Sequence, residues 1–199
     1  MEYKKVTSLV QQIVASCQQE SFGLSLTKLY KILYFIDFGH YALYHQPVSN
    51  FEYLRFKFGP VPKGLHDYLT LLEEEKVIDR RKVSNPYGEH EVFELYPDVH
   101  QAEYPFSPQE SETIEKTLRE FKQKSATTAS RETHYQSPWI TTSQGEIIPY
   151  DLAKYCDFSW LGYLADDKTM EEVQEIKGTR DMLRNDEEFQ DLWEQIQNL

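Results

Sequence analysis

Hydrophobic residues in the first quarter of the chain follow a helical period. From Tyr3 to Gln19 they recur at spacings of three and four, which predicts a helix with one inward stripe. From Leu26 to Tyr44 almost no polar face remains, and a helix that is apolar on all sides is typical of a central position. Gly23 suits the end of the first helix, and Ser25 suits the N-cap of the second.

After Pro47 the period changes from helical to alternating. Within Glu52–Phe58 the two faces carry Tyr53, Arg55 and Lys57 on one side and Leu54, Phe56 and Phe58 on the other. This alternation predicts a strand with one buried side. Two further runs, Val77–Val83 and Glu91–Tyr96, flank turn residues and predict a hairpin.

Four residues that follow the first strand, Gly59, Pro60, Val61 and Pro62, contain two prolines around one valine. A residue before proline avoids the helical region, and a proline fits the first turn of a helix because its missing N–H has no partner there. The sequence therefore predicts a stiff corner between the strand and a helix, with Pro62 in the first turn of that helix and apolar residues at helical spacing from Leu65 through Glu75.

The second half of the chain begins with a strong helix start. Ser107 as N-cap, Pro108 after it and Glu110 three residues after the cap predict a helix that runs to about Lys124. The small polar segment Ser125–Ser130 is expected to be a loop, and a short helix is expected over Tyr150–Cys156.

These elements predict an α+β fold that is predominantly α-helical. Its central helix is expected to be buried and its small antiparallel sheet to contain about three strands. Residues 1–165 are expected to form one domain. Residues 166–199 are expected to form an acidic helical extension packed on the same domain.

Composition and charge narrow the class of partners. Hydrophobic residues make up 40% and aromatic residues 14% of the 199, which suits a folded core. The net charge is −12, and Asp166–Leu199 carries eleven acidic against four basic residues. Such a field repels nucleic acids and membrane surfaces and attracts basic proteins. With no apolar run of about 18 residues, we expect a soluble, cytoplasmic protein, whose Cys17 and Cys156 lie in the core.

Candidates for catalysis are few. None of the six histidines has another histidine four residues away, and two cysteines cannot build a familiar zinc cluster, so neither a metal nor a cofactor is predicted. Asp37 and His40 can meet on one face of the central helix, with Lys31 and Tyr34 on nearby turns. A carboxylate that orients an imidazole is half of an acid–base device. We favour the alternative that these side chains pair with each other or with the backbone in the core, and we predict that the chain is not an enzyme.

Binding is the remaining class of function. Trp139 is either an interface anchor or a residue that fills the core. The predicted partner-binding residues are Tyr53, Arg55, Trp139, Phe189 and Trp193. A helix, strand and strand in Leu65–Tyr96 also have the order of a winged helix, which would place the basic run Arg80–Lys82 on its wing. A DNA-binding transcriptional regulator is therefore an alternative.

Two ordered motifs resemble the Panacea domain, the antitoxin domain of SocA-like and phage GepA-like proteins. The first joins a helix containing Lys31, Ile32, Leu33, Tyr34, Phe35 and Asp37 to the GPVP run of Gly59–Pro62. The second contains Ser137, Pro138, Trp139, Ile148, Pro149 and Tyr150. Together they span about Leu26 to Ala153, and Ile32 stands where leucine is common in the family.

The resemblance implies a mostly helical domain that neutralises a toxin encoded beside it through direct protein contact. It also implies a possible second role as a proteolytic adaptor that delivers the toxin to a ClpXP-type protease. Nucleic acid would be a partner only in autoregulation of the operon. A phage-associated role other than toxin control stays open as a further alternative.

Overall fold

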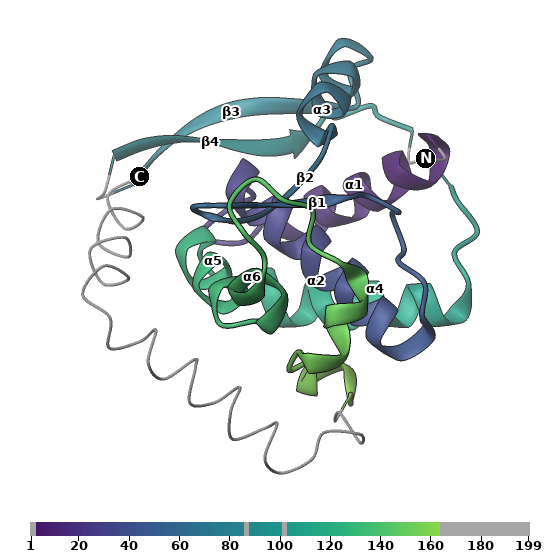
Figure 1. Cartoon of the computed structure of the whole chain (residues 1–199). Coiled ribbons are helices and arrows are strands. Elements are labelled where there is room, and N and C mark those ends of the chain that lie inside the picture. The colour runs from purple at the N-terminus through teal and green to yellow at the C-terminus, as the bar shows by residue number, and fades with distance from the viewer. Residues whose placement is uncertain (1–2, 86–87, 101–102, 164–199) are drawn as a thin grey trace.

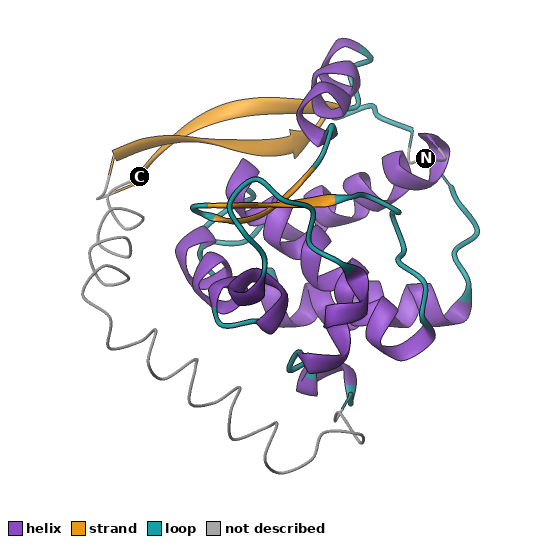
Figure 2. Cartoon of the chain, viewed as in Figure 1, coloured by secondary structure: helices purple, strands orange, loops and turns teal. Residues whose placement is uncertain are grey.

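The computed structural model describes residues 3–85, 88–100 and 103–163 (Figure 1). The predicted acidic extension, with Phe189 and Trp193, lies outside the described residues. Helices account for most of the described elements, and the strands form two pairs (Figure 2). The predicted class, α+β and predominantly helical, is confirmed.

The helices and strands follow one another as the sequence patterns predict for most of the chain. The α-helices are α1 (Tyr3–Cys17), α2 (Leu26–Tyr44), α3 (Leu65–Glu74), α4 (Pro108–Phe121), α5 (Ala126–His134) and α6 (Ser137–Thr141). Two 3-10 helices follow, η1 (Tyr150–Tyr155) and η2 (Ser159–Leu161). The strands are β1 (Tyr53–Phe56), β2 (Gly59–Pro62), β3 (Ile78–Asn85) and β4 (Gly88–Leu95).

The strands form two separate antiparallel pairs, β1–β2 and β3–β4, instead of one sheet of about three strands. The β3–β4 hairpin is the one that the sequence predicted. The β1–β2 hairpin was not predicted, because the GPVP run was interpreted as a corner; it is β2 itself. Pro62 accordingly ends a strand, and α3 begins only at Leu65.

Helix α2 is the axis of the molecule, as its apolar pattern predicts. It lies in the middle of Figure 1, where it contacts α4, α5, β2, β4 and η1. The ring of Phe35 stacks on Phe121 of α4 at 4.3 Å between centroids. Cys17 and Cys156 are buried, as predicted.

Serine side chains mark three helix starts. Ser25 accepts a hydrogen bond from the backbone N–H of Lys28, and Ser107 forms the predicted capping box with Glu110. Ser125 caps α5 in the same way by accepting from the N–H of Thr128. The prediction of a loop over Ser125–Ser130 is therefore wrong, because its first serine is an N-cap.

Among the described residues, none of the helices combines the length and the apolar character that crossing a bilayer needs.

Candidate functional site

The β1–β2 hairpin, which contains the GPVP run, is the candidate site. Its prolines fit the strand because of register: Arg55 is opposite Pro60 and Tyr53 is opposite Pro62. The backbone groups of Arg55 point away from β2, since its N–H donates to Glu146 and its carbonyl accepts from Gly145. The missing N–H groups of the prolines therefore cost no hydrogen bond within the hairpin.

Lys31 fixes β2 to the central helix. Its side chain is 1% exposed, and its Nζ donates to the carbonyl oxygen of Pro60 at 2.9 Å. Burial lowers the pKa of Lys31 from 10.5 to about 7. This buried lysine therefore connects the side of α2 that faces the hairpin to β2.

Asp37 fixes the beginning of β1. Its carboxylate is buried and accepts hydrogen bonds from the backbone N–H of Ser49 at 2.7 Å, from the hydroxyl of Ser49 and from the hydroxyl of Tyr53 at 2.7 Å. Burial raises the pKa of Asp37, while these hydrogen bonds lower it. The three donors satisfy the buried carboxylate and connect α2 to the segment that enters the hairpin.

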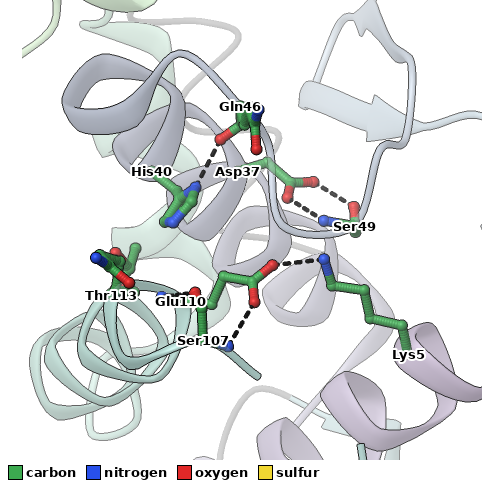
Figure 3. Close-up of polar contacts among 9 residues, drawn as sticks. Lys5, Asp37, His40, Gln46, Ser49, Ser107, Glu110 and Thr113 are labelled. Atoms are coloured by element: carbon green, nitrogen blue, oxygen red, sulfur yellow. Dashed lines mark hydrogen bonds and ion pairs between the residues drawn. The ribbon is translucent and has the colours of Figure 1, made fainter. Parts of the chain in front are cut away.

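His40 does not pair with Asp37. Its Nδ1 lies 2.6 Å from the carbonyl oxygen of Gln46, and Figure 3 shows the two side chains directed to different partners. The predicted pairing of the two side chains with each other is therefore wrong, whereas the alternative of backbone partners is confirmed. Asp37 and His40 are 0% and 5% exposed, so neither is open to a substrate in this structure.

Tyr34 packs its ring against the aromatic residues beside Asp37. Its ring contacts Phe38 at 4.3 Å and Tyr53 at 5.7 Å between centroids. Its side chain is fully buried, and burial is the main cause that raises its pKa well above the usual value. Tyr34 thus packs against the ring of Tyr53 from the side of helix α2.

Three of the predicted partner-binding residues lie in the described chain, and they differ in how far they are buried. Tyr53 is 0% exposed and Trp139 is 4% exposed, so both lie in the core. The indole N–H of Trp139 donates to the carbonyl of Phe56 at 3.1 Å, and the guanidinium of Arg55 lies 4.2 Å from its ring centroid. Arg55 is half-buried and also donates to Gln144 at 2.8 Å. In this structure these residues fix the hairpin from its inner side.

Two residues of the site, Ser49 and Thr133, gave no signal in the sequence pattern. Ser49 donates to Asp37, which lies in α2 before the loop that contains Ser49. Tyr150, which belongs to the second motif, donates its hydroxyl to the carbonyl of Phe51. Thr133 lies behind Gly59, where its Oγ1 would be 2.7 Å from an added Cβ. Such contacts depend on the tertiary fold, and a serine or threonine is common at many surface positions.

A hollow of about 560 Å³ lies elsewhere, between α1 and α4. Its lining is mostly small or polar, and it includes Gln11, Ser16, Ser111 and the acids Glu103 and Glu115. Its lining contains no cysteine, histidine or lysine.

Two of the three basic residues of the run on β3 form ion pairs with carboxylates. Arg80 forms an ion pair with Glu73, and Arg81 forms one with Glu94 at 2.6 Å. Guanidinium groups that are paired with carboxylates are poorly placed to neutralise phosphates. The order of helix and strands agrees with a winged helix, but the charges of these two arginines do not favour DNA binding.

A comparison with protein families finds one family whose matched range includes the hairpin. The family model described as antitoxin SocA-like, Panacea domain, matches residues 29–140, which is more than half of the chain. The match includes Lys31, Asp37, the GPVP run and Trp139. No curated protein and no solved structure matches the chain. The chain therefore belongs to the SocA-like antitoxin family that is defined by the Panacea domain.

Proposed function

We propose that this protein is the antitoxin of a type II toxin–antitoxin pair and that it neutralises a cognate protein toxin by direct contact. The observation that carries the proposal is the family match over residues 29–140. The proposal places the protein in the cytoplasm, where its toxin would act.

The chemistry of the candidate site supports binding over catalysis. Lys31 and Asp37, the lysine and the aspartate of the family motif in α2, are buried, and each has hydrogen-bond partners in the hairpin or in its entry segment. Groups that are sealed and satisfied in this way stabilise a shape. A stable shape with a defined surface is what a neutralising partner needs.

The charge of the chain supports a basic partner. The net charge is −12, and seven of these negative charges come from residues 166–199. A negative field speeds encounter with a cationic protein. We propose that Phe189 and Trp193 contribute apolar contacts in that extension.

The experiment is co-expression with the product of each gene that adjoins the gene for this protein. One of these products is expected to arrest growth when it is expressed alone, and growth is expected to return when this chain is induced with it. An empty vector and a frameshifted version of this gene serve as controls. If no neighbouring product is both toxic alone and harmless with this chain, the proposal is wrong.

Delivery of the toxin to a ClpXP-type protease is a separate proposal, which the family resemblance suggests. It predicts that the toxin has a shorter half-life in the presence of this chain and that loss of the protease removes the effect. An unchanged half-life together with full neutralisation would limit the mechanism to masking.

A further inference from the structure

One face of the β1–β2 hairpin is apolar and is turned toward solvent. Residues directly opposite in an antiparallel pair share a face, and so do residues two apart on one strand. Leu54 is opposite Val61 of β2 and also opposite Ile147, which follows α6, and Phe56 lies two residues beyond Leu54. We name these four residues, Leu54, Phe56, Val61 and Ile147, the outer face.

The outer face is accessible. Phe56 is 40% and Ile147 is 47% exposed, while Leu54 and Val61 are half-buried. The opposite face contains the buried residues Tyr53, Pro60, Pro62 and Ile148. The hairpin therefore buries a tyrosine and two prolines and leaves a phenylalanine and an isoleucine outside. Apolar side chains that gather on a fixed surface are typical of an interaction site.

Polar contacts on the inner side specify this orientation. The hydroxyl of Tyr53 donates to Asp37, Lys31 donates to Pro60, and Trp139 donates to the carbonyl of Phe56. A shift of one residue along β1 would exchange its two faces and break the contact of Tyr53 with Asp37. The outward position of Phe56 is thus imposed by several contacts that include two buried ionisable groups. A surface that is fixed before binding loses little entropy when a partner docks.

In the part of the chain that the structure describes, the other large exposed hydrophobic residues lie outside the β1–β2 hairpin. Tyr3 donates its hydroxyl to Glu75, and Tyr44 lies against the ring of His40. Phe22, which is 52% exposed, and Leu71, which is 39% exposed, come from the α1–α2 connection and from α3. These two residues match Ile147 and Phe56 in exposure, and neither belongs to the hairpin.

Charge and size select the occupant of the outer face. Two copies of this chain would each carry −12 and would repel one another. Four side chains, two of them half-buried, also provide much less than the roughly 800 Å² per partner that a stable interface needs. The same net charge of −12 attracts a partner of opposite charge.

We propose that the outer face is the apolar centre of the interface with the toxin and that this toxin is a basic protein with a matching apolar surface. The inference rests on the proposed function and adds the site and the chemistry of the partner. Apolar contacts at the centre of an interface govern the dissociation rate, whereas overall charge governs the association rate.

The test compares two double variants that differ in position but not in the kind of change. Phe56→Ser with Ile147→Ser removes the outer face, and Phe22→Ser with Leu71→Ser removes a similar exposed apolar area elsewhere. The probe is the purified neighbouring gene product that arrests growth. The outer-face variant is expected to dissociate at least about tenfold faster and to lose rescue, while the control variant stays within about twofold of the wild type. Circular dichroism melting establishes that both variants fold.

The possible results separate a failure of the proposed function from a failure of the proposed interface. If the wild type relieves no growth arrest, the proposed function fails, and the inference fails with it. If the wild type and the outer-face variant give equal rescue and equal dissociation rates, the function stands and the outer face is not the interface. If sedimentation shows a wild-type dimer that the outer-face variant loses, a second copy is the occupant and the inference is overturned. Should the double variant unfold, the single change Ile147→Asp on the 47% exposed residue takes its place.

Discussion

The side-chain nitrogen of Lys31 lies 2.9 Å from the carbonyl oxygen of Pro60, and the lysine is 1% exposed. This contact joins the two halves of the family motif, the helix α2 and the GPVP strand. It also places an ionisable group where water cannot stabilise its charge. The same relationship predicts how the stability of the protein depends on pH.

The stability contributed by Lys31 should rise with pH. Its pKa is about 7 in the folded protein against 10.5 when exposed, so between these values the unfolded chain binds more protons. The free energy of unfolding of the wild type, relative to Lys31→Met, is expected to increase by a few kcal/mol from about pH 7 to 10.5 and to stay level below pH 7. Urea denaturation at several pH values measures it. A constant difference across that window would mean that the lysine is solvated.

The hydrogen bonds that Asp37 accepts should contribute to the free energy of unfolding. Tyr53→Phe removes one donor to a buried carboxylate and is expected to cost about 1–2 kcal/mol in the free energy of unfolding. Asp37→Asn weakens all three contacts and is expected to cost about 3 kcal/mol. The matched control is Tyr41→Phe, because Tyr41 donates to Asp151 at the surface and should cost less than about 0.5 kcal/mol.

Urea denaturation of the Asp37→Asn variant, the Tyr53→Phe variant and their double variant forms a double-mutant cycle, which measures the coupling between the two side chains. Since the two side chains share one hydrogen bond, the two costs should add to more than the cost of the double variant. Strict additivity would show that the bond contributes nothing to folding.

Gly59 should tolerate alanine less well than Gly64. Both have positive φ, +98° and +79°, which alanine adopts only with strain. A Cβ at Gly59 would also lie 2.8 Å from the Nζ of Lys31 and 2.7 Å from Thr133, whereas nothing lies within 4 Å at Gly64. Gly64→Ala is expected to cost about 1 kcal/mol and Gly59→Ala at least about 2 kcal/mol more. Equal melting temperatures for the two variants would show that the hairpin is free to move away from α2.

Removal of residues 166–199 should slow association with the toxin. The deletion removes −7 of the net charge of −12, and steering depends on that charge. The association rate at low salt is expected to fall about tenfold, and the difference should nearly vanish at about 0.5 M salt, where charges are screened. Stopped-flow mixing measures the rate. Unaltered association and rescue by a truncated chain that still folds would remove the extension from the binding mechanism.

The sequence predicted most helices because helical periodicity is local. The stripe in α1 and the capping box at Ser107 and Glu110 depend on residues within a few positions of one another. The N-cap role of Ser125 was missed because the residues that follow it are small and polar, and burial of α5 against α2 compensates for that weak pattern.

The hairpin could not be predicted because its register depends on residues that are far apart. Two prolines in four residues suggest a corner unless the backbone of the opposite strand is known to point away from them. Likewise, Asp37 and His40 share a helix face in projection, but loop residues 46 and 49 supply their partners. Only the tertiary fold shows that the buried side of β1 is that of Tyr53.

If this protein neutralises its toxin by contact, the two purified proteins must form a complex, and sedimentation measures that complex. An equimolar mixture is expected to sediment as one heavier species, and the toxin is expected to lose its activity in proportion to the complex formed. Two separate species in a mixture whose toxin is nevertheless inactive would show that neutralisation does not depend on contact.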